Sequence, residues 1–75
     1  MNEEKIKEHE EKFPILRFFR YKHLPPRLQY ICQMFYETGH LLVLRLPDGE
    51  CARAERQVAL RKLLEAKDAA VWAAL

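Results

Sequence analysis

Two stretches with helical periodicity flank one strong turn signal, and this arrangement restricts the chain to a helical hairpin. The turn signal is Pro47-Asp48-Gly49, in which the proline stops a preceding helix and the aspartate can cap the next one. The first helix should begin near Pro26, because a residue that precedes a proline is pushed toward extended backbone. From there one glycine and several apolar residues recur at spacings of three and four: Leu28, Ile31, Cys32, Phe35, Gly39, Leu42 and Leu46. A short link between two long helices gives an antiparallel αα-hairpin, so we expect an all-α fold.

The second long helix should run from about Glu50 to the C-terminus, with apolar residues on two neighbouring faces. One face carries mostly small residues and the other carries larger ones: Ala59, Leu63, Ala66, Ala70 and Ala74, then Leu60, Leu64, Val71 and Leu75. Upstream of the hairpin, Pro14 could open a short helix at its first turn. Its apolar residues Ile15, Leu16, Phe18 and Phe19 would then pack, with Arg17 and Arg20 pointing outward. We therefore expect a single hairpin domain over residues 13–75.

Residues 1–12 differ sharply in composition from the rest of the chain. They carry five Glu and three Lys, and Ile6 is the one apolar residue between positions 2 and 12. We expect a solvated tail or a frayed helix, poorly ordered in either case, because such a segment has little apolar surface to bury. The other residues carry a formal charge of +4, from ten Lys or Arg against six acids. This excess is too small to indicate binding to duplex nucleic acid, but it suits a small anionic ligand.

The chain is too short to build a strong core of its own. Domains below roughly 70–80 residues rarely obtain more than about 3–5 kcal/mol of stability from a single core, and they often need disulfides, a metal or partner chains. Cys32 and Cys51 are expected to be two free thiols, and the three histidines are scattered without the spacing of a metal site. Further apolar residues lie outside the first helix's stripe: Tyr30, Met34, Leu41, Val43 and Leu44. Self-association into a symmetric homo-oligomer is the expected source of the missing stability.

Neither a membrane span nor a signal peptide is expected. No apolar run approaches the roughly 20 residues that a spanning helix needs, and the N-terminus is charged where a signal peptide is apolar. These patterns indicate a soluble, intracellular protein.

The segment from Arg17 to Arg27 is the first candidate binding site. It holds several basic residues with no acid, interleaved with Phe18, Phe19 and Tyr21. Aromatic faces can stack on bases, and the arginine fork matches phosphate oxygens. His23 could donate to a phosphate or a base edge. The alternative is purely structural: the phenylalanines belong to the core and the basic residues form a solvated face.

A second basic cluster is expected on the last helix. Arg53, Arg56, Arg61 and Lys62 lie there among acids, and Arg61 is spaced to pair with Glu65. The cluster is therefore either a charge-laced surface or, in a symmetric oligomer, a pocket where copies of these residues converge on an anion.

Catalytic signatures are absent from the sequence, so we expect no enzymatic activity and no cofactor. The chain has no serine, Cys32 has no obvious base within its helical turn, and the two glycines form no phosphate loop. Glu37 and His40 are three apart and could touch, but such a pair is more often a surface contact.

Two stretches together resemble a known family. Phe19-Arg20-Tyr21-Lys22-His23-Leu24-Pro25 fits an aromatic-x-Tyr-x-His-Leu-Pro motif. Leu46-Pro47-Asp48-Gly49, followed by the run from Val58 to Val71, fits the second half of the same pattern. Over residues 18–75 the chain is similar to the small phage-encoded hairpin domain of anti-CBASS and anti-Thoeris proteins.

The resemblance implies a helical hairpin that assembles into a hexamer. It implies binding of cyclic dinucleotides at subunit interfaces, and of cyclic trinucleotides at separate threefold pockets in some members. The ligand would be sequestered without cleavage, which keeps a bacterial CBASS effector from being switched on in the cytoplasm of the infected host.

By position, the resemblance implies that Tyr21 stacks on a base and that His23 helps to fix the phosphate edge. Phe19 is the aromatic residue of the motif, and Arg27 joins the site by charge and proximity alone. Candidates for the threefold pocket are Arg56, Arg61 and Lys62. One departure is Trp72, where the family pattern favours arginine.

Two other functions remain open. A protein–protein interaction module, docking on a host or phage protein, would explain the surplus apolar surface equally well. A nucleotide-degrading enzyme is the least favoured alternative, because no catalytic residues are apparent.

Overall fold

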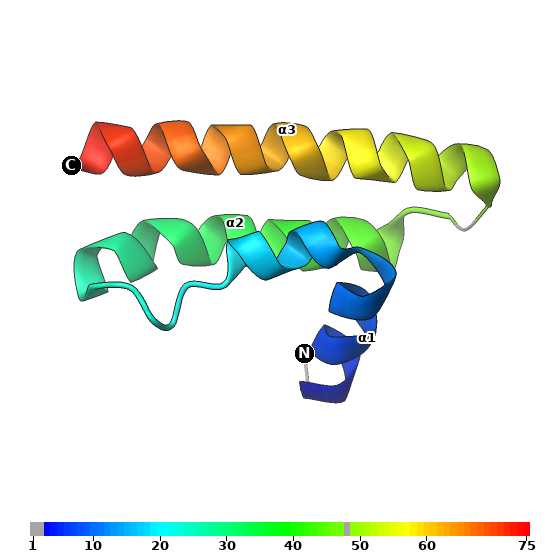
Figure 1. Ribbon diagram of the computed structural model, residues 1–75, viewed down its shortest axis with the longest axis horizontal. Coiled ribbons are helices and arrows are strands. Elements are labelled where there is room, and N and C mark those ends of the chain that lie inside the picture. Colours follow the sequence, from blue (N-terminus) through cyan, green and yellow to red (C-terminus); the bar gives the residue numbers. More distant parts are fainter. Residues whose placement is uncertain (1–2, 48) are drawn as a thin grey trace.

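The computed structural model describes residues 3–47 and 49–75, and every regular element in them is helical. Helix α1 spans Glu3–Lys12 and is followed by the 3₁₀ helix η1, Pro14–Phe19. The long helices α2, Pro26–Arg45, and α3, Glu50–Ala74, run antiparallel and pack as a hairpin, with η1 lying along it and α1 turning away (Figure 1). The predicted all-α hairpin preceded by a short helix is confirmed.

Prolines and a glycine define the ends of the long helices. Pro26 opens α2 directly after Pro25, whose φ of −57° and ψ of 150° are extended, as the sequence predicts. Gly49 precedes α3 with a φ of 136°, a backbone conformation that strongly favours glycine. Asp48, which was expected to cap α3, lies outside the described residues.

The core forms where η1 meets the hairpin. Its buried apolar residues are Phe13, Leu16, Phe19, Val43 and Leu60, with half-buried neighbours from α2 and α3 packed around them. A 3₁₀ helix has three residues per turn, so positions 13, 16 and 19 share one face. The core is therefore a three-way junction of η1, α2 and α3 rather than a simple two-helix seam.

This geometry explains two differences from the sequence predictions. Phe18 was expected to pack, but it is 66% exposed because it lies off the buried face of η1. Val43 was expected outside the buried stripe of α2, but it is buried. Since α2 is covered by both η1 and α3, its buried face is wider than a hairpin alone would require.

Gly39 lies at the junction itself. A Cβ atom there would be 3.3 Å from Cδ2 of Leu16 and 3.8 Å from Cδ2 of Leu60 and of Leu63. The helical segments therefore pack closely at this glycine.

The charged segment expected to be a poorly ordered tail forms helix α1 over Glu3–Lys12. Two of its residues are buried, namely His9 and Glu10. His9 contacts His40 of α2, and Glu10 pairs with Arg20 just after η1. Because these contacts are polar and their partners lie 31 and 10 positions away, the apolar pattern of the segment gives no sign of them.

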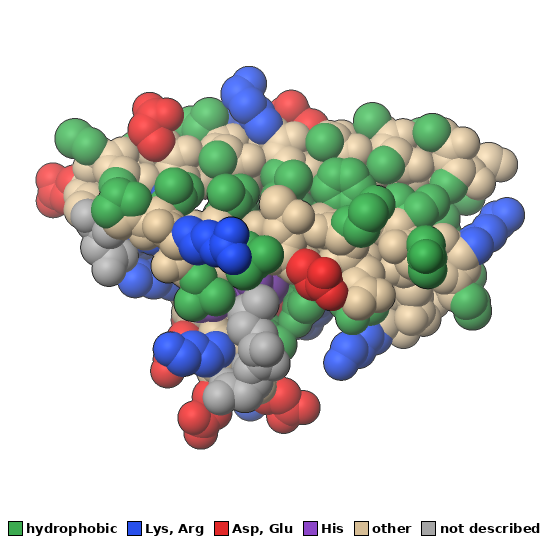
Figure 2. All heavy atoms as spheres, turned by 180° about the vertical axis from the view of Figure 1, so that it is seen from behind, with side chains coloured by type: hydrophobic (Ala, Val, Ile, Leu, Met, Phe, Trp, Pro, Cys, Tyr) green, Lys and Arg blue, Asp and Glu red, His purple; other side chains and the backbone are tan. Residues whose placement is uncertain are grey.

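Much apolar surface remains exposed along the hairpin (Figure 2). Among the described residues, the exposed large apolar side chains are Phe18, Tyr30, Met34, Leu41, Leu44, Leu46, Val58, Trp72 and Leu75. Both cysteines are free thiols, as expected, with Cys32 buried and Cys51 exposed. None of the helices in the described part of the chain is long and apolar enough to cross a membrane.

Candidate ligand-binding pocket

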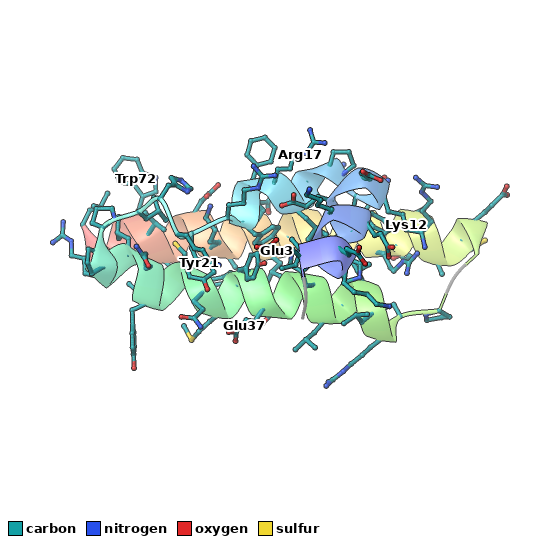
Figure 3. The ribbon with its side chains drawn as sticks, turned by 90° about the horizontal axis from the view of Figure 1, so that it is seen from below. Glu3, Lys12, Arg17, Tyr21, Glu37 and Trp72 are labelled. Atoms are coloured by element: carbon teal, nitrogen blue, oxygen red, sulfur yellow. The ribbon has the colours of Figure 1, made fainter. Side chains whose placement is uncertain are left out.

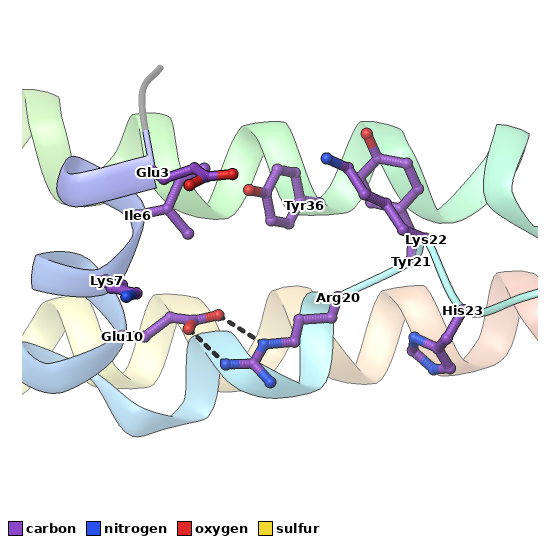
Figure 4. Close-up of a pocket in the computed structure, with 9 residues that line it drawn as sticks. All are labelled: Glu3, Ile6, Lys7, Glu10, Arg20, Tyr21, Lys22, His23 and Tyr36. Atoms are coloured by element: carbon purple, nitrogen blue, oxygen red, sulfur yellow. Dashed lines mark hydrogen bonds and ion pairs between the residues drawn. The ribbon is translucent and has the colours of Figure 1, made fainter.

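A cavity of about 600 Å³ lies between α1, the segment that follows η1, and α2 (Figure 4). It is larger than two further cavities, of about 130 and 270 Å³, that described residues line. Four lining residues come from α1, four from positions 20–23 and one from α2: Glu3, Ile6, Lys7, Glu10, Arg20, Tyr21, Lys22, His23 and Tyr36. The pocket therefore joins the charged N-terminal helix to the aromatic-basic stretch.

Two tyrosines form the aromatic part of the pocket. The rings of Tyr21 and Tyr36 meet edge to face, with centroids 5.1 Å apart and planes at 65°. Both side chains are half-buried, so part of each ring can be reached by a ligand. Burial, together with the nearby Tyr21 hydroxyl, raises the pKa of Tyr36, which keeps this phenol neutral at physiological pH.

An ion pair closes the pocket on the side of α1. Arg20 donates from Nε to Oε2 of Glu10 at 3.0 Å and from Nη2 to Oε1 at 2.7 Å. The hydrogen bonds from Arg20 hold the pKa of Glu10 below its usual value, so the carboxylate stays ionised. One edge of the Arg20 fork is consequently occupied within the chain.

The segment carrying Tyr21, Lys22 and His23 is tied to α2. Leu24 donates its backbone N–H to the carbonyl of Tyr21 at 3.0 Å and closes a turn. Gln29, in the first turns of α2, donates from Nε2 to the carbonyl of Lys22 at 3.1 Å and to that of Leu24 at 2.6 Å. These bonds fix the backbone while Lys22 and His23 keep exposed side chains at the pocket.

The structure brings together only two of the predicted site residues, Tyr21 and His23. Figure 3 shows Tyr21, which belongs to the chain that follows η1, beside α2. Arg27 is exposed on the first turn of α2 and does not line the pocket. Phe19 is fully buried in the core, so its ring offers no face to a ligand in this conformation.

The residues of the predicted basic cluster on α3 differ in burial. Arg56 is only 3% exposed: it donates from Nη1 to the carbonyls of Val43 at 3.3 Å and Leu46 at 3.4 Å, and its Cζ lies 4.9 Å from the centroid of Phe13. It therefore caps the C-terminus of α2. Lys62 is exposed, and Arg61 borders a small cavity of about 130 Å³ beside Phe13.

Several pocket residues were missed from sequence. Arg20 and Lys22 belong to the basic stretch that the sequence singled out, so that signal was present. Lys7 and Glu10 were hidden by the expectation of a disordered tail. Tyr36 has no distinguishing sequence signal, since aromatic residues at helical spacing usually belong to the core.

A second polar cluster lies behind the pocket. Nδ1 of His9 is 2.9 Å from Nδ1 of His40, and the ring of His40 lies 4.7 Å from that of Tyr36. The contact that the spacing of Glu37 and His40 would allow is not formed, because His40 is fully buried and Glu37 accepts a hydrogen bond from Gln33. No group of three His, Cys, Asp or Glu residues in the described ranges is placed to hold a metal ion.

The fold and the pocket define a small helical-hairpin domain with a polar, aromatic cavity at its N-terminal helix. Comparisons of the chain with protein-family models, with curated proteins and with solved structures found no match.

Proposed function

We propose that this protein binds and sequesters cyclic dinucleotides, and cyclic trinucleotides at a second site, as a phage protein that blocks bacterial CBASS signalling. The observation that carries the proposal is the pocket at residues 20–23. The stretch that resembles the family motif also contributes four residues to the lining of this cavity of about 600 Å³.

The chemistry of the pocket suits a nucleotide anion. Two partly accessible tyrosine rings offer stacking surfaces, and base–aromatic stacking contributes about 1–3 kcal/mol per base. Three cationic side chains line the cavity against two carboxylates, which leaves a formal excess of +1. Of these cations, Arg20 is paired with Glu10, whereas Lys22 directly follows Tyr21, so Lys22 is our candidate for the phosphate anchor. The volume falls within the roughly 300–1,000 Å³ of small-molecule pockets.

Sequestration without cleavage is supported by the state of Glu10 in the pocket. A general base is most effective when its pKa lies near the working pH. Both oxygens of Glu10 accept hydrogen bonds from Arg20, and the lowered pKa makes this carboxylate a weak base. We therefore expect bound ligand to be recovered intact.

Self-association is supported by the exposed apolar side chains of α2 and α3. Tyr30 is 83% exposed, Met34 60% and Trp72 76%, which is costly surface for a domain of this size. We propose that these faces are covered in a symmetric hexamer. The exposed Arg61 and Lys62 are then candidates for a threefold trinucleotide pocket, while Arg56 acts within its own chain.

The same apolar surface also favours a second function, docking on a host or phage protein. The two functions differ in what covers the surface. A stoichiometric partner recovered in a pull-down, together with no binding of cyclic nucleotides, would favour docking.

The proposal is tested by calorimetric titration with panels of cyclic dinucleotides and trinucleotides, using two matched lysine variants. Lys22→Gln should weaken dinucleotide binding at least tenfold and leave trinucleotide binding unchanged. Lys62→Gln should show the opposite pattern. Absence of binding by the unaltered protein at micromolar concentration, across both panels, would refute the proposal.

A further inference from the structure

Helix α1 forms one wall of the pocket but is held there mainly by polar contacts. Among its described residues, Ile6 is the one apolar side chain, and it is only half-buried. The buried residues of α1 are His9 and Glu10, which contact His40 and Arg20 respectively. A helix attached in this way depends on the protonation states of its contacts rather than on apolar burial.

One arrangement of protons suits the histidine contact better than the others. Two Nδ1 atoms 2.9 Å apart share a hydrogen bond only if one carries a proton and the other is bare. His40 is fully buried, and its Nε2 has no hydrogen-bond partner in the described part of the chain. The favoured arrangement is therefore His40 donating from Nδ1, with its Nε2 bare, and His9 accepting.

An additional proton destabilises this pair at whichever histidine it binds. If it joins His40, the ring becomes a buried cation with an unpaired Nε2–H. If His9 becomes the charged donor instead, His40 must accept at Nδ1, and its own proton moves to the same unpaired Nε2. A proton on both Nδ1 atoms would break the hydrogen bond. Each protonated state thus carries a desolvation penalty that disappears when the two helices separate.

We propose that the His9–His40 pair is a pH-dependent latch, which docks α1 against α2 at neutral pH and releases it on acidification. The consequence for ligand rests on the proposed function of the pocket. Release of α1 removes the wall that carries Glu3, Ile6, Lys7 and Glu10, so the cavity opens and loses affinity.

Burial and the charges around the pair together lower the pKa of both histidines. The charged and titratable groups around the pair come from α1, from the segment after η1 and from α2: Lys5, Glu8, Glu10 and Lys12, then Arg20, then Tyr36. Burial first, and then the charges of Lys5 and Lys12, lowers the pKa of His9, with Glu8 opposing. Burial first, and then His9, lowers the pKa of His40, with Glu10 opposing.

The sign of the pH effect follows from these lowered values. Above the ordinary histidine pKa of 6.5, both the docked and the released rings are neutral, and docking is fully stable. As the pH falls below that value, the released histidines take up protons that the docked pair resists, so the equilibrium shifts toward release. The Glu10–Arg20 ion pair persists through this window, because the pKa of Glu10 lies below 4.5.

The test is hydrogen exchange of the full chain at about pH 7.5 and pH 5.0, corrected for intrinsic exchange rates. Protection of amides in α1 should fall at least tenfold relative to α3 at the lower pH. In the double variant His9→Phe/His40→Phe, which replaces both titrating rings, this fall should disappear, whereas His23→Gln should retain it. Equal protection of α1 at both pH values in the unaltered protein, or a fall that survives in the double variant, would overturn the latch.

Titration with the panel of cyclic dinucleotides, cyclic di-AMP among them, at the two pH values separates the latch from the proposed function. Loss of dinucleotide affinity at low pH in the unaltered protein, absent in the double Phe variant, supports control of the pocket by the latch. Undiminished dinucleotide affinity while α1 is released would refute that control. Absence of binding by every member of the panel at both pH values would refute dinucleotide binding by the pocket, and hydrogen exchange alone would then decide whether the latch exists.

Discussion

Replacing Arg56 by methionine tests whether this arginine is structural, as the fold indicates, or part of a ligand site, as the sequence suggested. Methionine keeps an unbranched apolar stem and has a helix propensity close to that of arginine. The change therefore removes the guanidinium with little other perturbation. The affected contacts are the hydrogen bonds to the carbonyls of Val43 and Leu46 and the stacking over Phe13.

The expected loss of stability can be estimated from these contacts. The hydrogen bonds are long, at 3.3 and 3.4 Å, so each should contribute about 1 kcal/mol, below the usual range for a charged donor. The cation–π contact at 4.9 Å adds about 1 kcal/mol. The variant no longer incurs the desolvation cost of burying the Arg56 charge, which offsets roughly one third of this sum and leaves a net loss of about 2 kcal/mol in the free energy of unfolding. For a domain of this size, the loss corresponds to a Tm lowered by about 8–16 °C.

The assay is thermal unfolding followed by circular dichroism, at a fixed protein concentration because self-association raises the apparent Tm. Arg53→Met is the matched control, since Arg53 is exposed and its Cζ lies 5.8 Å from the centroid of the same ring. This control should lose about 0.5 kcal/mol or less. Equal Tm values for the two variants, or loss of trinucleotide binding by Arg56→Met with an unchanged Tm, would refute the structural role of Arg56.

Three further predictions concern the pocket, the thiols and the ion pair. Tyr21→Ala should weaken dinucleotide binding by about 1–3 kcal/mol and leave the size of the oligomer unchanged in size-exclusion chromatography. Dissociation of the oligomer would instead place Tyr21 in the subunit interface. In a thiol-reactivity assay of the native protein, Cys51 should react within minutes and Cys32 only after denaturation, because Cys51 is exposed and Cys32 is buried. Equally fast labelling of the two thiols would contradict the burial of Cys32. Since the pKa of Glu10 is lowered, its ion pair with Arg20 should stabilise the fold above about pH 4.5 and weaken as the pH falls below that value. In urea denaturation, Glu10→Gln should flatten this pH dependence of the free energy of unfolding. An unchanged pH profile in the variant would contradict the stabilising role of the ion pair.

The hairpin could be predicted from sequence because its signals are local. The Pro25-Pro26 pair marks the start of α2, and the turn signal at positions 47–49 marks the end of α2 and the start of α3. Apolar spacing indicates part of their buried faces. The position of η1 could not be predicted in the same way. Whether Phe18 or Phe19 is buried depends on a 3₁₀ geometry with three residues per turn, and an α-helical pattern cannot distinguish the two.

The site could be predicted only where it is contiguous in sequence. Tyr21 and His23 lie within one motif, and the structure places both at the pocket. Tyr36 and the residues of α1 reach it through long-range contacts, such as the one between His9 and His40. Arg56 was misjudged because a basic side chain was assumed to be solvated, whereas it caps a helix terminus across the hairpin.

Native mass spectrometry of the full chain, alone and with mixed cyclic dinucleotides and trinucleotides, tests the proposed function most directly. We predict a hexamer that gains discrete ligand masses, released unchanged on denaturation. A protein that binds neither class of ligand, or that returns them hydrolysed, would contradict sequestration.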